Sequence, residues 1–466
     1  MTEYPPVSET LRKKRLTATM NHRLPPLRLL SLDGGGVRGF STIMLVQELM
    51  LKLFHELYGR APRMEEIPKP CDHFDLIGGT GTGGLIAILL GRLRLDLETC
   101  KKVYIHVTKK VFETDKTIAG LPYRKTLFKA SKLEEAIREV MREYAGREDE
   151  EKEGFQKGHL HINPVTRSNT SDSYNSSQGS RSSWRSGSAA WGNGNMNEPL
   201  LDPRPKICRV FLTAVYKGSD DTTSPALLRT YNSTHATAPS SDITIWEAGR
   251  ATCATYPAFK SIQIGQSIFL DEGSGRYSPV AQVLEEALVH EWPGREVGLL
   301  VSIGSGKAPE IEYKKETSSM IAASPLGKFI EAKEKHMAKV LDCEEVHKEL
   351  LDGLHRTGVK TENYVRLNVE SGITDFGMNE WSRIADISTR TRAYLGRPDI
   401  QVINQSAAAK LAEIARISSG RNTIDLLNRE LPDLPTRTSD IREEFDDDEV
   451  RKHFEQLDRI AARIRV

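Results

Sequence analysis

Two segments of the chain repeat one pattern, which consists of a short apolar run, a glycine-rich turn and a long apolar stretch. The first segment covers residues 28–58 and centres on DGGGVRG at 33–39. The second covers residues 74–93 and centres on GGTGTGG at 78–84. Short apolar runs that end in glycine are typical of buried strands, and the long stretches are typical of buried helices. Strand, glycine turn and helix, twice over, predict an α/β fold with a mostly parallel central sheet.

The rest of the chain supplies further strands and helices around this repeat. Apolar runs predict strands at 207–216, 226–231, 261–270 and 297–303, and helical patterns cover 95–144, 279–291, 325–356 and 380–418. Ser, Gly and Asn make up 19 of the 30 residues at 168–197, so we interpret this stretch as a disordered insertion in a surface loop. We therefore divide the chain into a basic leader at 1–27, an α/β domain at 28–310 with that insertion, and a helical C-terminal region at 311–466.

Charge and cysteine content argue against several classes of protein. Of the 466 residues, 65 are Lys or Arg and 64 are Asp or Glu, so the net charge of +1 provides no general attraction to nucleic acid. The five cysteines form no C-x-x-C pair, as is typical of reduced thiols inside cells. No apolar stretch approaches the roughly 18–20 residues that span a bilayer, and residues 1–15 lack the apolar core of a secretory signal. We expect a cytoplasmic protein that contacts membranes at most peripherally.

The first glycine turn fits G-x-G-x-x-G, which has two physical interpretations. Dinucleotide binding needs an acidic residue about 20 residues later, at the end of a second strand. Glu56 has about that spacing but falls within a helical pattern. In the other interpretation, the backbone N–H groups of Gly34, Gly35 and Gly36 converge on an anion, either a phosphate or the oxyanion of an acyl transfer. Arg38 would then steady the anion or cap the turn.

The second turn has the context of a nucleophile elbow, G-x-S-x-G, in which small residues let a strand turn sharply into a helix. Here Gly79 and Gly83 flank the centre, but the centre itself is Gly81. Asp271 ends a predicted strand just before a Glu-Gly turn. Such a carboxylate can deprotonate a hydroxyl or can simply initiate a turn. Both interpretations of Asp271 stay open from spacing alone.

Taken together, six strings resemble the patatin-like phospholipase family. They are LSLDGGGVRG at 30–39, FDLIGGTGTGG at 74–84, PALLRTY at 225–231, WEAGRATCA at 246–254, FLDEG at 269–273 and VSIGSG at 301–306. The resemblance implies a three-layer α/β fold and hydrolysis of phospholipid or acylglycerol esters by a Ser–Asp dyad, without a metal or other cofactor. It implies that Gly34, Gly35 and Gly36, with Arg38, form the oxyanion loop and that Asp271 is the base of the dyad.

The chain departs from the family pattern at the nucleophile. Gly81 stands where the family has serine, and glycine has no hydroxyl with which to form an acyl-enzyme. Three interpretations follow. The chain is an inactive pseudoenzyme that binds lipid or acts as a scaffold, or a hydrolase with Thr80 or Thr82 as nucleophile, or a hydrolase in which Asp271 activates water. Residues on either side of the centre of an elbow point elsewhere, which counts against both threonines. Ser278-Pro279 also stands where the family often has asparagine before proline.

The remaining polar clusters predict no metal site. His159 and His161 form a lone H-x-H, and residues 446–449 (DDDE) lack the alternating ligands and glycine of a calcium loop. Trp184 and Trp191 of the insertion could touch a membrane surface, or they are incidental to a disordered loop. The expected partner is a lipid substrate or membrane surface and not nucleic acid, and a protein partner could bind through 311–466.

Overall fold

The structure is a computed structural model, and it describes residues 24–113 and, with gaps, 117–430. The described ranges after residue 113 are 117–118, 121–122, 126, 128–145, 194–204, 208–218, 225–233, 242–255, 258–271, 278–307, 343–370, 372–374, 376–377 and 379–430. The chain divides into two compact units, Met1–Arg416 and Ile417–Val466. Several features singled out in the sequence lie outside the described residues, namely residues 1–23 of the leader, 168–193 of the insertion with both its tryptophans, His159, His161 and the acidic 446–449.

The first unit is built on a mixed, mostly parallel sheet with the strand order β10-β9-β1-β2-β5-β8-β7. The first five of these strands are parallel to their neighbours, whereas β8 is antiparallel to β5, β7 to β8, and β6 pairs with β5 off the main order. Their bounds are β1 Leu27–Leu32, β2 Leu76–Gly79, β5 Arg209–Tyr216, β6 Ala226–Arg229, β7 Ile262–Ile264, β8 Ser267–Asp271, β9 Val297–Ile303 and β10 Tyr364–Leu367. A separate pair joins β3 (Thr117–Ile118) to β4 (Leu121–Pro122). The predicted mostly parallel sheet is confirmed.

Helices cover both faces of this sheet. The helices of the first unit are α2 Gly39–Tyr58, α3 Pro70–His73, α4 Thr82–Ala87, α5 Leu97–Phe112, α6 Ala130–Tyr144, α8 Ile245–Thr252, α9 Val280–Glu285, α12 Ile384–Leu395 and the part of α13 (Pro398–Glu430) up to Arg416. Single π-helical turns extend α4 (η3, Ile88–Arg92) and α9 (η4, Glu286–Glu291). Short 3-10 turns are η1 Gly36–Arg38, η2 Met64–Glu66, η5 Leu354–Thr357, η6 Thr361–Asn363 and η7 Trp381–Arg383.

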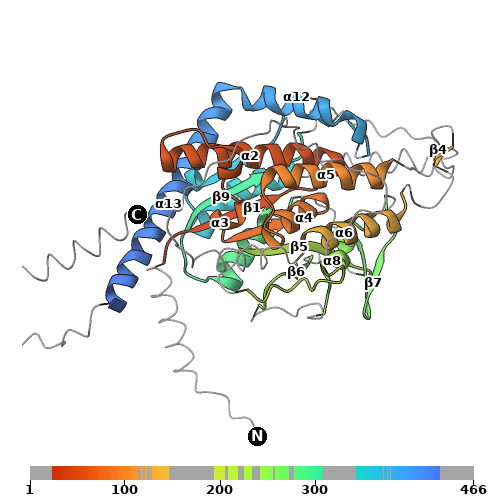
Figure 1. Cartoon of the computed structure of the whole chain (residues 1–466), viewed down its shortest axis with the longest axis horizontal. Coiled ribbons are helices and arrows are strands. Elements are labelled where there is room, and N and C mark those ends of the chain that lie inside the picture. Colours follow the sequence, from red (N-terminus) through yellow and green to blue (C-terminus); the bar gives the residue numbers. More distant parts are fainter. Residues whose placement is uncertain are drawn as a thin grey trace, which may run out of the picture. The chain divides into compact units, whose positions relative to one another are not determined.

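The alternation of side chains along β1 separates the two cores. Leu30 and Leu32 belong to the larger core, which also contains side chains of α2, α4, α5, α6, α8 and α12. Leu27 and Leu29 belong to the second core, with side chains of α9 and of the helical stretch at 343–353. Successive residues of a strand face opposite sides of the sheet, so a strand that is apolar at every position requires cover on both sides. In Figure 1 the helices α2, α4 and α5 lie along one side of the strands. The predicted three-layer α/β fold is confirmed.

Three expected elements differ in detail. The single strand expected at 261–270 is a hairpin of β7 and β8, because Gly265 takes a φ of +56° and turns the chain back. The helical pattern at 95–144 is two helices, α5 and α6. The described residues after 311 are helical in large part, but they also contribute a strand, β10, which pairs with β9 in the central sheet.

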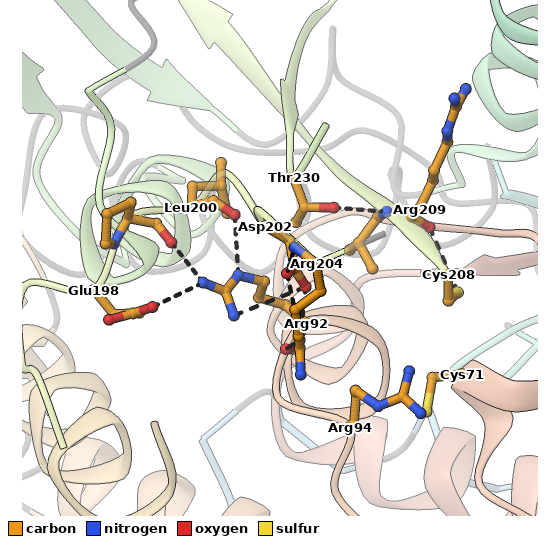
Figure 2. A network of polar contacts seen from close by, with 12 residues as sticks. Cys71, Arg92, Arg94, Glu198, Leu200, Asp202, Arg204, Cys208, Arg209 and Thr230 are labelled. Atoms are coloured by element: carbon orange, nitrogen blue, oxygen red, sulfur yellow. Dashed lines mark hydrogen bonds and ion pairs between the residues drawn. The ribbon is translucent and has the colours of Figure 1, made fainter. Parts of the chain in front are cut away.

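A polar network holds the chain where it returns from the insertion (Figure 2). Arg92, at the end of η3, donates hydrogen bonds to the carbonyl oxygens of Leu200 (3.1 Å) and Pro199 (3.0 Å) and to the carboxylate of Glu198 (3.1 Å). Asp202 lies nearby and accepts two hydrogen bonds from the guanidinium of Arg204. Charge-assisted contacts of this kind are stronger than neutral hydrogen bonds. These contacts position the segment just before β5. The strand β5 pairs with β2, which leads into the second glycine turn.

Candidate functional site

The two glycine turns meet because their strands are neighbours. The strands β1 and β2 are parallel and in register, with Leu32 opposite Gly79. The carboxyl ends of parallel strands lie at the same edge of a sheet, where α/β proteins place their binding sites. The turn after β1 (residues 33–39) and the turn after β2 (residues 80–82) therefore face each other.

Three contacts fix the glycine turn after β1. The Ser305 hydroxyl donates to the carbonyl oxygen of Gly34 (2.7 Å), the Arg38 Nε to that of Gly35 (3.1 Å), and the Tyr104 hydroxyl to that of Gly36 (2.5 Å). Each of these carbonyl groups shares a planar peptide group with the N–H of the next residue, so the hydrogen bonds also fix the directions of those N–H groups. Burial raises the pKa of Tyr104 well above its ordinary value, so its phenol keeps the proton that it donates.

Close packing explains why the turn needs glycine. A Cβ atom on Gly35 would lie 1.9 Å from the Ser305 hydroxyl oxygen, and Gly36 takes a φ of +63°. Arg38 is fully buried, and its Nε hydrogen bond to the carbonyl oxygen of Gly35 ties it to the turn itself. Of the two roles expected for Arg38, this contact favours the one in which it shapes the turn.

The turn after β2 has the backbone of a nucleophile elbow. Gly81 takes φ +57° and ψ −124°, a conformation that is strained for any residue other than glycine, and α4 begins at the next residue. The N–H of Gly81 donates to the Thr252 hydroxyl (2.9 Å). A Cβ atom on Gly79 would lie 2.4 Å from the Gly83 carbonyl oxygen, and one on Gly83 would lie 2.3 Å from that of Leu32. The spacing Gly79-x-Gly81-x-Gly83 is thus the one that this sharp turn requires.

The two threonines of the elbow point in different directions. Thr80 is buried, and its hydroxyl forms a hydrogen bond with the Thr213 hydroxyl of β5 (2.8 Å). Thr82 is partly exposed, and its Oγ1 accepts hydrogen bonds from the N–H groups of Gly35 (3.1 Å) and Gly36 (3.0 Å). The Thr82 hydroxyl therefore occupies the two N–H groups that an acyl oxygen would use.

Asp271 is placed by its backbone. It is the last residue of β8 and lies opposite Val215 of β5, and β5 in turn neighbours β2. One strand therefore separates the strand of Asp271 from the strand of the elbow. The side chain of Asp271 lies outside the described atoms, so its role as a base stays a prediction.

Sequence reasoning missed three side chains that shape the site. Ser305 belongs to VSIGSG at 301–306, which covers the end of β9 and the turn after it, and β9 is the other neighbour of β1. An apolar strand that ends in glycine, as β1 does, is the signal that could have placed Ser305 near the first turn. Thr252 likewise belongs to one of the six strings, WEAGRATCA at 246–254, and lies at the end of α8. Tyr104 carries no comparable sequence signal, because it lies within α5, outside all six strings.

The described part of the chain has neither a cluster of metal-binding side chains nor a membrane-spanning helix. There, no three His, Cys, Asp or Glu side chains are grouped so as to hold a metal ion. None of the helices among the described residues is long and apolar enough to cross a bilayer.

A comparison with known protein families identifies the family of this chain. A model of the patatin-like phospholipase family matches residues 30–280, more than half of the chain. The chain belongs to the patatin-like phospholipase family. The matched region of this patatin-like protein contains both glycine turns and Asp271, and it ends before β9 and β10.

Three relatives of this patatin-like protein are each longer than it is. It is 23% identical to calcium-independent phospholipase A2-gamma of Rattus norvegicus over 413 residues, which cover 85% of this chain and 41% of that protein. It is 37% identical to Patatin-like phospholipase 1 of Plasmodium falciparum over 93 residues, 20% of this chain and 13% of the relative. It is 38% identical to Phospholipase A I of Arabidopsis thaliana over 89 residues, 18% of this chain and 6% of the relative. The chain thus spans less than half the length of each of these relatives.

Proposed function

We propose that this protein binds lipid acyl esters in its patatin-like site without forming an acyl-enzyme at residue 81. The observation that carries the proposal is that the elbow has no hydroxyl group at its centre and that the hydroxyl groups on either side are already hydrogen-bonded. Gly81 has none, the Thr80 hydroxyl is bonded to Thr213, and the Thr82 hydroxyl is bonded to the N–H groups of the glycine turn. Without a free hydroxyl at the centre, the covalent step of a serine hydrolase has no attacking atom.

The class of ligand follows from the family and from the shape of the site. The named relatives are phospholipases, whose substrates are acyl esters of glycerol. Two convergent N–H groups beside an elbow suit the carbonyl oxygen of such an ester, which would replace the Thr82 hydroxyl as their acceptor. We also expect the protein to work in the cytoplasm and to meet its ligand at a membrane surface.

A second candidate function is hydrolysis, either by Thr82 or by a water that Asp271 activates. The position of Thr82 favours it, because this hydroxyl lies within 3.1 Å of both loop N–H groups. One atom cannot attack the carbonyl carbon while occupying the N–H groups that must bind the carbonyl oxygen. Binding of the ester carbonyl already requires the Thr82 hydroxyl to leave these N–H groups. Attack by Thr82 requires in addition that the displaced hydroxyl face the carbonyl carbon, which makes this candidate the weaker of the two.

Hydrolysis of phospholipid in mixed micelles separates the two candidates. The purified chain is compared with Asp271→Asn and Thr82→Val, and each is also tested for flotation with liposomes. Background hydrolysis by all three with retained flotation supports lipid binding without turnover. Hydrolysis that Asp271→Asn abolishes would overturn the proposal, and Thr82→Val then identifies the nucleophile, since it blocks attack by threonine but not by water.

A further inference from the structure

Arg366 is a buried arginine at the site, and it comes from outside the family-matched region. It lies in β10, and its side chain is 7% exposed. Its Nη2 lies 2.7 Å from the carboxylate of Asp33 and 2.8 Å from that of Glu344, and its Nη1 donates to the Ser302 hydroxyl (2.8 Å). The guanidinium thus joins β10, β9 and the end of β1.

Asp33 connects this arginine to the glycine turn. It directly precedes Gly34, is 1% exposed, and its own N–H donates to the carbonyl oxygen of Ile303 (3.0 Å). A buried carboxylate is costly unless a cation faces it. Arg366 supplies that cation, so the position of the Asp33 side chain, and with it the start of the turn, depends on β10.

The same group of residues supports the turn from its other side. Asn368 accepts a hydrogen bond from the N–H of Gly306 (2.7 Å) and donates one to Glu344 (2.8 Å). Ser305, next to Gly306, donates to the carbonyl oxygen of Gly34 (2.7 Å). Because a Cβ on Gly35 would overlap Ser305, the turn has little room to shift without moving this support.

We propose that Arg366 is a positioning residue for the patatin-like site, acting through Asp33 to direct the N–H groups of Gly35 and Gly36 at the ligand. The inference rests on the proposed function, since it concerns the same site. It also implies that the strand at 364–367, beyond the family-matched region, is required for a working oxyanion loop.

The groups that face Asp33 predict a pH signature. They are Arg366 and Tyr364 of β10, Cys343 and Glu344 at the start of the helical stretch at 343–353, and Ser278, while His347 contacts Tyr364. Burial raises the pKa of Asp33, and the Arg366 guanidinium opposes that rise. In Arg366→Met the carboxyl loses the one cation among these groups. It stays neutral at low pH and becomes an unpaired buried anion as the pH rises.

The test uses a fluorophosphonate probe on the full chain carrying Gly81→Ser. In this reaction the serine oxygen bonds to phosphorus, fluoride leaves, the serine proton passes to a base, and the phosphoryl oxygen takes the two loop N–H groups. The variants are Arg366→Met, Asp33→Asn with Arg366→Met, and Arg60→Met, which removes an exposed arginine from its pair with Glu66. Labelling rates are measured from pH 6 to 9, and circular dichroism confirms the fold of each variant.

We expect Arg366→Met to slow labelling at least tenfold relative to Gly81→Ser alone, with a deficit that grows as the pH rises. The double variant, Asp33→Asn with Arg366→Met, should recover most of the labelling rate and lose the pH dependence. Arg60→Met should have no effect. If Arg366→Met labels within twofold of its parent at every pH, or if the double variant recovers nothing, Arg366 does not act through Asp33.

A second measurement keeps the inference testable if Gly81→Ser is not labelled at all, an outcome that would count against the proposed function. Hydrogen exchange of the peptide covering residues 33–39 is then compared in the Gly81 background. Faster exchange in Arg366→Met than in Arg60→Met, reversed by Asp33→Asn, supports the positioning role. Equal exchange in all variants overturns it.

Discussion

Restoring a hydroxyl at residue 81 is the most direct perturbation of this site, and its cost can be worked out from the backbone. Gly81 takes φ +57° and ψ −124°, a region in which a residue with a Cβ atom is strained by about 1–3 kcal/mol. Gly81→Ser and Gly81→Ala both introduce that Cβ atom. We therefore expect each variant to lose about 1–3 kcal/mol of unfolding free energy, by similar amounts, in urea denaturation followed by circular dichroism.

The alanine variant isolates the contribution of the hydroxyl. Both variants carry the same strain, but only serine supplies an attacking atom beside the N–H groups of Gly35 and Gly36. A nucleophile contributes roughly 10⁶-fold to kcat in a serine hydrolase. Even if the site is only partly aligned, Gly81→Ser should hydrolyse a p-nitrophenyl ester at least ~100-fold faster than Gly81→Ala.

Two results would refute this reasoning. If neither variant is destabilised, residue 81 does not have the strained backbone from which the elbow is inferred. If both are destabilised but hydrolyse the ester equally slowly, the hydroxyl has been restored and the glycine turn or Asp271 is not in working geometry. Adding Asp271→Asn to Gly81→Ser should abolish the gain and so identify the base.

Three further predictions concern stability. Thr82→Val leaves two N–H groups without their acceptor and should cost about 1–3 kcal/mol in urea denaturation, whereas Thr82→Ser should cost less than about 1 kcal/mol; equal losses would contradict the observed contacts. Arg229→Met leaves the buried Glu286 carboxylate with the Tyr231 hydroxyl but without the arginine that faces it (2.5 Å in the native pair), and should cost about 3–5 kcal/mol, much of it recovered by adding Glu286→Gln. Burial, with a smaller contribution from Arg28, lowers the pKa of His73 to about 4, so the unfolded chain takes up a proton there below about pH 6.5 while the folded chain does not. Stability should fall by up to about 3 kcal/mol between pH 6.5 and 4, and His73→Gln should lose that part of the pH dependence.

Local sequence patterns predicted the framework of the fold well, for a physical reason. Residues 27–32 and 297–303 are apolar at most positions and carry apolar residues on both faces, which requires a strand covered on both sides. The glycines at 79, 81 and 83 occur where backbone atoms approach too closely for a Cβ or where φ is positive. Such constraints act within a few residues, so they can be predicted from the local sequence.

Other elements depended on contacts that no local pattern encodes. In the sequence, the hairpin of β7 and β8 looks like a single apolar run, because only the short turn at Gly265 and Gln266 interrupts the pattern. The strand β10 is four residues long and lies among helical patterns. Its strand conformation comes from pairing with β9, which tertiary structure supplies.

The sequence by itself determined the α/β class, the two glycine turns, the family and the absence of a hydroxyl at residue 81. Only the tertiary structure decided where the neighbouring hydroxyls go: Thr80 to Thr213, 133 residues away, and Thr82 to Gly35, 47 residues away. It also decided that Arg366 faces Asp33. A hydrogen bond depends on distance and direction between groups far apart in the chain, and these are set only when the strands are ordered in the sheet and the helices pack against it.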